Sequence, residues 1–269
     1  KQLEAARQVI PQAEAAVADA PALVQSVKRA ATRGQELLAA LNKAPYGSPQ
    51  DVQELRQIIV TLQGAPRTLE IVRQAKAAGR NYVAYPWNHP TTLSRTQAPG
   101  GGFTAAGGSA LDAVACPGEY EPVSAFVYPF QDLAGVTVSC GDLTGRAGVI
   151  PASAVDIRLV KAWFQGASNN IGYTPRKWLI PELLLKDDAL VRVDVEKQTN
   201  YLRSTRADGT QEYLVCSDPD SSNLKDVRPV DAATLQPMDV KAGEAREVWI
   251  TIHVPDQAKP GTYTGTVTF

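Results

Sequence analysis

The chain has 269 residues and a formal net charge of -1, with 44% hydrophobic and 20% charged residues. This composition is ordinary for a globular protein, and the length is enough for one or two domains with a sizeable core. The charge lacks the basic excess of nucleic-acid-binding proteins, and no apolar run reaches the ~20 residues of a membrane-spanning helix. We therefore expect neither a nucleic-acid partner nor a membrane span.

The first residue is Lys1 rather than methionine, so we interpret the chain as a processed or trimmed product, which is compatible with a removed export signal. Because the cysteines number three, at least one thiol is free. One disulfide among Cys116, Cys140 and Cys216 is compatible with the sequence, which does not select the pair. The two histidines and the absence of a C-x-x-C spacing predict no metal, redox motif or cofactor.

Residues 1–80 predict a helical domain, either a bundle or a set of hairpins. They are rich in strong helix formers, and their apolar residues recur at the spacing of one helix face. Pro11 and Pro21 interrupt the pattern and predict kinks or breaks. The stripe comprises Leu3, Val9, Ile10, Ala13, Val17, Leu23, Val24, Val27, Ala31, Leu37, Leu38 and Leu41.

Two more helices are expected before residue 80. Ser48 and Pro49 form a helix start, and Gly64 is a natural stop for that helix. A further helix is expected from Pro66 to Gly79. These helices are individually marginal and need each other, or the next domain, to bury their apolar faces. We interpret the segment as a packed helical spacer, with a partner-binding or oligomerising bundle as the alternative.

Residues 81–108 are punctuated by proline and glycine and predict a linker between two domains. Tyr82, Tyr85 and Trp87 are expected to anchor it to the neighbouring domain.

Residues 109–269 predict an antiparallel β-sandwich. Apolar residues alternate with polar ones in several short segments, which is typical of half-buried strands, and turn-rich connections separate them. The segments are 136–140, 155–159, 191–195, 248–254 and 263–269. The expected fold class is therefore α + β in separate domains, helical first and then a sandwich. Because Phe269 still lies in an alternating segment, we expect the chain to be a fragment cut before a following domain.

A series of motifs in this β region resembles the N-terminal β-sandwich of bacterial proteins similar to glycoside hydrolase family 123 and their unassigned relatives. The resemblance extends from about Leu111 to Phe269. The motifs, in order, are GEYEPVS at 118–124, DLAGV at 132–136, IPASAVDIRLVK at 150–161, PELLLKDD at 181–188, LQP at 235–237, WITIHVP at 249–255 and AKPGTYTG at 258–265.

The resemblance implies that catalysis belongs to a (β/α)₈ barrel that follows the sandwich. Such a barrel needs ~250 residues, so its acidic pair has no counterpart here and no catalytic residue is carried over. The resemblance also implies an extracellular, periplasmic or cell-surface location in a bacterium.

The most tempting carboxylates are Glu182, Asp187 and Asp188. Glycoside hydrolysis needs two carboxyl groups ~5 to 9.5 Å apart across the scissile bond. Adjacent aspartates on a strand point to opposite faces, so this pair fits poorly and is expected to cap a turn or bind backbone amides. Glu119 and Glu121 are expected to hold a strand start rather than to act chemically.

The aromatic residues Trp163, Tyr173, Trp178 and Trp249 have two readings, with Phe164 grouped beside them. The first interpretation is a sugar-stacking platform, since carbohydrate C–H faces pack on aromatic rings. The second, a role in the core or between domains, is favoured because aromatic residues are usual in both places. Trp163 and Trp178 bracket an expected loop, Gly166 to Gly172. His253 is expected to point away from the apolar face of its strand.

The leading hypothesis is a non-catalytic accessory domain of a secreted or surface polysaccharide-processing protein, with its own downstream catalytic barrel as partner. One alternative is a carbohydrate-binding module. The other is a structural surface protein that assembles through its helices. The sugar, its linkage and the oligomeric state are not encoded in any motif of the chain.

Overall fold

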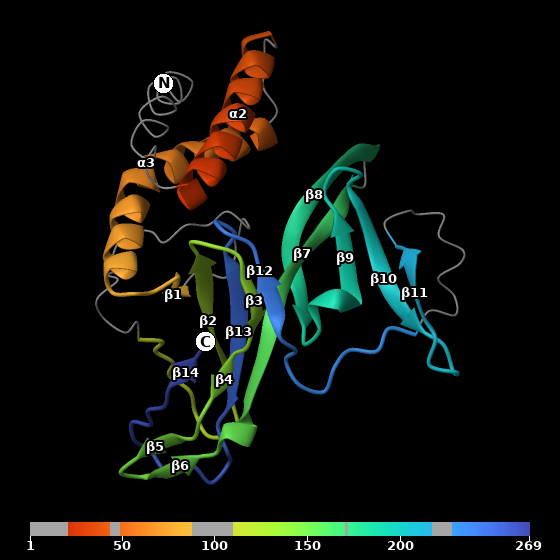
Figure 1. Cartoon of the computed structure of the whole chain (residues 1–269). Coiled ribbons are helices and arrows are strands. Elements are labelled where there is room, and N and C mark those ends of the chain that lie inside the picture. Colours follow the sequence, from red (N-terminus) through yellow and green to blue (C-terminus); the bar gives the residue numbers. More distant parts are fainter. Residues whose placement is uncertain (1–20, 44–48, 88–109, 170–171, 217–227) are drawn as a thin grey trace.

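The computed structural model describes residues 21–43, 49–87, 110–169, 172–216 and 228–269. Two helices precede a series of antiparallel strands (Figure 1). The helices are α2 (Pro21–Lys43) and α3 (Pro49–Ala77), and two short 3₁₀ turns are η1 (Ala152–Ala154) and η2 (Asp188–Leu190). The strands are β1 (Tyr82–Trp87), β2 (Tyr120–Pro129), β3 (Leu133–Val136), β4 (Ser139–Cys140), β5 (Leu143–Gly145), β6 (Gly148–Ile150), β7 (Val155–Asn169), β8 (Gly172–Leu185), β9 (Val191–Asp194), β10 (Thr199–Thr205), β11 (Gln211–Val215), β12 (Met238–Val240), β13 (Arg246–His253) and β14 (Val267–Thr268).

Helix α2 begins at Pro21, where the fixed φ of proline suits the first helical position. The breaks expected at Pro11 and Pro21 depend on residues 1–20, which lie outside the described part. The predicted apolar stripe is buried at Val27, Ala31, Leu37 and Leu38.

Helix α3 is a single helix of 29 residues, whereas two helices with a stop at Gly64 were expected. That prediction is wrong because burial continues through the proline: Leu62, Ala65 and Leu69 lie in one core cluster on both sides of it. Pro66 removes one backbone donor, and the Thr68 hydroxyl donates to the carbonyl of Gly64 at 3.1 Å. Both features bend helices, and α3 changes direction along its length in Figure 1.

The helices share a core with the sheet. Side chains of α2 and α3 join Tyr85 of β1 and Phe126 and Tyr128 of β2 in one buried cluster. The helices were expected to bury their stripes against each other or against the next domain, and this one cluster holds residues of both helices and of the sheet. Within the described ranges the helical part is a pair of helices laid on a sheet, and a bundle with a core of its own is not shown.

The main sheet has five antiparallel strands in the order β1-β2-β13-β7-β8. Its first strand, β1, covers residues that the sequence assigned to the linker. Of the aromatic residues expected to anchor this segment, Tyr85 and Tyr82 pack in the two main core clusters, while Trp87 pairs with Ser124 through its backbone and its side chain lies outside the described part. The rest of the expected linker, residues 88–108, lies outside the described part.

Two short ladders, β3–β12 and β4–β14, cover the face of the main sheet that points away from the helices. Met238 and Val240 of β12 pack in one cluster with Leu159, Val248 and Ile250 of the main sheet. The arrangement is mixed, with two helices and several antiparallel sheets. None of the described helices is long and apolar enough to cross a membrane.

Strands β9, β10 and β11 form a separate three-stranded sheet beside the β7–β8 hairpin (Figure 1), and we call it the outer sheet. Asn200 of β10, which is 1% exposed, bonds both backbone groups of Phe164 in β7, at 2.8 Å to the nitrogen and 2.6 Å to the oxygen. The side-chain amide of Asn200 therefore makes the two hydrogen bonds that the backbone of a neighbouring strand would make, and it holds the outer sheet against the hairpin.

Candidate functional site

The aromatic residues predicted as a site lie on three strands. Trp163 is on β7, Tyr173 and Trp178 are on β8, and Trp249 is on β13. The β7–β8 register places Trp178 opposite Gln165 and Tyr173 opposite Ser168, so these two strands bring three of the four residues onto one hairpin. Trp249 lies opposite Ser124 and Arg158 in the main sheet. The side chains of Tyr173 and Trp178 lie outside the described part.

Trp163 is half-buried and is held by a polar group. Its indole N–H donates to the carboxylate of Glu182, and the amide of Gln165 donates to the same oxygen at 2.5 Å. The ring packs against the cluster of Leu185, Leu190 and Val191. This arrangement gives Trp163 a packing role and leaves two polar side chains beside its ring. Contact with a sugar at these aromatics stays a prediction.

The adjacent acids Asp187 and Asp188 are directed to different partners. Asp187 accepts from the backbone N–H of Ala189 at 2.9 Å, which caps η2, and forms an ion pair of 2.7 Å with Arg203. Asp188 lies 2.6 Å from Lys161, whose side chain is 6% exposed. The expectation that these acids cap a turn is confirmed for Asp187, and the two carboxylates act as separate anchors.

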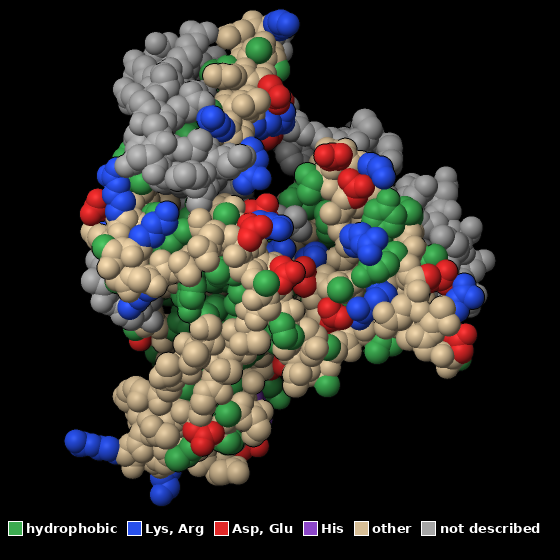
Figure 2. Space-filling model, viewed as in Figure 1, with side chains coloured by type: hydrophobic (Ala, Val, Ile, Leu, Met, Phe, Trp, Pro, Cys, Tyr) green, Lys and Arg blue, Asp and Glu red, His purple; other side chains and the backbone are tan. Residues whose placement is uncertain are grey.

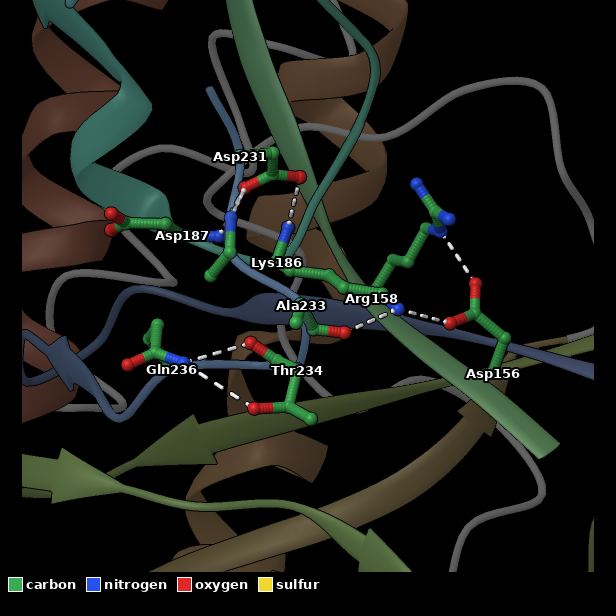
Figure 3. Close-up of polar contacts among 9 residues, drawn as sticks. Asp156, Arg158, Lys186, Asp187, Asp231, Ala233, Thr234 and Gln236 are labelled. Carbon is green, nitrogen blue, oxygen red and sulfur yellow. Dashed lines mark hydrogen bonds and ion pairs between the residues drawn. The ribbon is translucent and has the colours of Figure 1, made fainter. Parts of the chain in front are cut away.

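A polar network continues from this point along the edge of β8 (Figure 3). Asp231 accepts the backbone N–H groups of Lys186 and Asp187, each at 2.9 Å. The ammonium of Lys186 lies 2.7 Å from Asp156 and 2.9 Å from the carbonyl oxygen of Ala233. The network therefore joins residues 231–236 to the main sheet. On the face in Figure 2, acidic and basic side chains are intermixed over the middle of the molecule.

Glu247 of β13 is a charged residue in an unexpected place. It is 4% exposed, and neither carboxylate oxygen has a well-formed hydrogen bond among the described residues. Burial raises the pKa of Glu247 to about 7, and the Ser124 hydroxyl opposes this rise only in part. The alternating segment expected from the sequence began at Val248 and did not include Glu247. Glu247 is buried because the helical layer covers its side of the sheet. Alternation along the strand does not reveal that layer and so could not predict this burial.

Two tyrosines lie in the same region. Tyr128 is 1% exposed, its hydroxyl has no hydrogen-bond partner among the described residues, and burial raises its pKa to about 12. Burial also raises the pKa of Tyr85 well above its usual value, and the charges of Tyr128 and Glu247 add to that rise. Buried acids with shifted pKa values are candidates for function as well as for strain.

Other features are simpler. All three cysteines are free. The ring of His253 stacks on Tyr120 with centroids 4.3 Å apart. Glu119 accepts from the N–H of Cys116 at 2.7 Å, as expected of a residue that holds a strand start. Across the described ranges, His, Cys, Asp and Glu side chains form no cluster of three that would hold a metal ion.

A cavity of about 1320 Å³ lies between the main sheet and the segment that ends at Phe269. Its lining is mainly apolar and includes Val123, Ile250 and Ile252. Pro86 and Ala110, which flank residues 88–109, also line it. We assign no ligand to it.

Comparison with known proteins bears on the C-terminal region. Residues 184–269 match the family model described as glycoside hydrolase 123 N-terminal domain. A comparison with curated proteins finds no match. Among solved structures, the chain is similar to a family 123 glycoside hydrolase from Clostridium perfringens, studied for glycolipid glycan hydrolysis, with 17% identity and a TM-score of 0.30. The similarity covers 57% of this chain and 18% of that one.

The matched region begins near the end of β8 and contains the anchors Asp187, Asp188 and Asp231. The resemblance seen in the sequence is confirmed from residue 184 onward, and the motifs before it lie outside the matched range. Residues 184–269 of this chain therefore form a region like the N-terminal domain of glycoside hydrolase family 123.

Proposed function

We propose that this chain is the accessory, non-catalytic region of a secreted or surface-located, glycoside-hydrolase-like protein that processes polysaccharides in a bacterium. Its work is to support and orient a catalytic barrel. The observation that carries the proposal is the match of residues 184–269 to an N-terminal, rather than a catalytic, domain of family 123. The two layers of strands around Val248 and Ile250 support a β-sandwich as the scaffold.

The carboxylates of the matched region support the same role. Asp187 and Asp188 pair with Arg203 and Lys161, and Asp231 binds backbone amides. Carboxylates whose oxygens are bound by such internal partners join segments of the fold to one another. These three groups therefore suit a scaffold.

The test compares two materials in one assay. The first is the 269-residue chain, and the second is the polypeptide recovered from the source bacterium with an antibody against that chain. We expect glycosidase activity on chromogenic glycosides and glycolipid glycans only in the second, together with a mass above 28.8 kDa. The excess should be that of a barrel, ~250 residues.

Two results would overturn the proposal. One is hydrolysis by the 269-residue chain that disappears when one of its carboxylates is replaced. The other is a recovered polypeptide of 28.8 kDa without activity, which would leave the binding or structural alternatives.

A second candidate function is direct binding of a carbohydrate beside Trp163. The half-buried ring with Gln165 and Glu182 at its edge combines a stacking surface with polar groups, which is the composition that a sugar needs. Trp163→Phe keeps the packing on the Leu185 cluster but loses the indole N–H. If this function holds, a native gel that contains polysaccharide should slow the migration of Trp163→Phe less than that of the wild type. Trp249→Phe should be slowed as much as the wild type. Equal retardation of the wild type and both variants would exclude it.

A further inference from the structure

The helical pair is attached to the main sheet over a buried carboxyl group. Ala245, two residues before Glu247 on β13, belongs to the core cluster that contains the helices. Phe126, which lies opposite Glu247 on β2, belongs to the same cluster. Because alternate residues of a strand share a face, Glu247 lies on the side of the sheet that the helices cover.

Polar and charged groups approach this position from each neighbouring element. Strand β1 contributes Tyr85, and β2 contributes Ser124 and Tyr128. Helix α2 contributes Arg29, whose guanidinium acts on Tyr128 but pairs with Glu244 at 3.8 Å. On the neighbouring strand β7, Arg158 lies opposite Trp249, two residues from Glu247 along the same face, and pairs with Asp156 at 2.5 Å. The described buried face of α3 is apolar apart from Thr68, whose hydroxyl donates to its own helix.

The two cations of this region, Arg29 and Arg158, thus have other carboxylates as partners. A neutral Glu247 fits such an environment, since it leaves no charge unpaired. An ionised Glu247 does not, because the Ser124 hydroxyl only partly offsets the free-energy cost of a buried charge, which persists until water or a cation reaches it. Water reaches this face when the helices separate from the sheet.

Helices α2 and α3 are the layer that can separate from the main sheet. Strand β13 is hydrogen-bonded along both edges, to β2 and to β7. The described contacts of α2 and α3 with the sheet are made by side chains in the shared cluster and by the Arg29–Glu244 pair. Layers held by side-chain packing open locally at a lower free energy than the centre of a sheet.

We propose that protonation of Glu247 controls how firmly α2 and α3 are held on the main sheet: the helices are bound tightly when this carboxyl is neutral and loosen when it is ionised. The carboxyl loses its proton near neutral pH in the docked state, whereas an exposed glutamate does so near 4.5. The docking equilibrium therefore weakens as pH rises between these values, by up to on the order of 100-fold.

Hydrogen exchange of the full chain tests the proposal. Exchange of amides in residues 27–41 and 55–75 is followed between about pH 5 and about pH 9, corrected for intrinsic rates and compared with β7 as the internal reference. In the wild type we expect the protection of the helices, relative to β7, to fall as pH rises from about 5 to about 7 and to level off above that. In Glu247→Gln, which is neutral and nearly isosteric, we expect protection that does not change with pH.

Glu244→Gln is the matched control, because it removes a carboxylate from the same interface without touching the buried group. Its helices should keep the wild-type pH dependence. The proposal is overturned if wild-type protection of the helices is independent of pH, if Glu247→Gln retains the dependence, or if Glu244→Gln abolishes it.

A second measurement does not depend on the variant folding. Infrared difference spectra of the wild type between acidic and alkaline pH report the carbonyl stretch of any carboxylic acid that is still protonated near pH 6, where exposed acids are ionised. A buried acid that titrates near pH 7 is the expected result. A spectrum in which all carboxyl groups have ionised by about pH 5 would overturn the proposal.

Discussion

The guanidinium of Arg203 on β10 lies 2.7 Å from the carboxylate of Asp187, two residues after the end of β8. Both side chains are largely buried, at 13% and 20% exposure, so the pair joins the outer sheet to the end of the hairpin. Breaking one partner of such a pair leaves the other charge poorly solvated. Asp187→Asn should lower the free energy of unfolding by about 2 kcal/mol, measured by urea denaturation.

The Arg206–Glu212 pair in the same outer sheet is the control, because its side chains are 62% and 37% exposed. Glu212→Gln should cost less than about 0.5 kcal/mol. A loss in this exposed pair as large as that of Asp187→Asn would contradict the assignment of Asp187 as an anchor.

Asn200 holds the outer sheet by a different means, a pair of hydrogen bonds to the backbone of Phe164. Asn200→Ala leaves both backbone groups without their partner in a buried place. We expect a loss of about 2 kcal/mol in the free energy of unfolding. Thr199→Ala removes an exposed hydrogen bond one residue away and should change the stability by at most about 0.5 kcal/mol. Similar losses in the two variants would count against the anchoring role.

Gly145 lies where the turn of β5 meets the backbone of Thr262. A Cβ at Gly145 would overlap the carbonyl oxygen of Thr262, and backbone cannot rotate away as a side chain can. Gly145→Ala should therefore destabilise the protein by about 1 to 3 kcal/mol in thermal unfolding. Gly141→Ala meets no atom within 4 Å and should be neutral or slightly stabilising. The reverse order of melting temperatures would show that this contact is absent.

The pH dependence of stability should carry the signature of Glu247. Its pKa is raised from 4.5 to about 7 in the folded state, so the native protein binds the extra proton between these values. The contribution of Glu247 to the free energy of unfolding is then largest below pH 4.5. It falls as pH rises to about 7 and does not change further above that. With allowance for solvent screening, the total loss should be about 1 to 3 kcal/mol. Urea titrations of the wild type should show this slope, and those of Glu247→Gln should lack it.

The three thiols should differ in reactivity toward a disulfide reagent. Cys116 is exposed, whereas Cys140 and Cys216 are half-buried and burial raises their pKa values. A raised pKa lowers the fraction of reactive thiolate. Cys116 should therefore react first, and Cys116→Ser should remove the fast phase. A fast phase that survives in this variant would place an accessible thiol elsewhere.

The parts of the fold that could be predicted from sequence are those where one side of an element faces a core. Strand β13 was recognisable because Val248 and Ile250 alternate with polar residues. Alternation did not mark strand β2, which was expected only from the motif at residues 118–124, because six successive residues up to Pro129 are buried. Helices cover one of its faces and the short ladders cover the other, so alternation disappears.

Strand β8 shows a second limit. It contains Pro175 and Pro181, and prolines argue against a central strand, but β8 is the edge of its sheet and tolerates them. The loop from Gly166 to Gly172, expected from its glycine and asparagine content, is shorter in the structure, because β7 continues to Asn169 and β8 begins at Gly172.

The candidate site was predicted only in its parts. The role of Asp187 as a cap followed from the chemistry of adjacent aspartates, and its partner Arg203 came from pairing of distant segments that local sequence does not encode. Glu247 was missed because its environment is set by helices almost two hundred residues earlier in the chain.

The position of β13 in the main sheet has a consequence for biosynthesis. This strand lies at the centre of the sheet, between β2 and β7, yet it is the last of the five to leave the ribosome. Until residues 246–253 emerge, β2 and β7 have open edges that face each other without a partner. Such edges invite pairing with other chains, so nascent protein stalled before this point should be the species that chaperones bind.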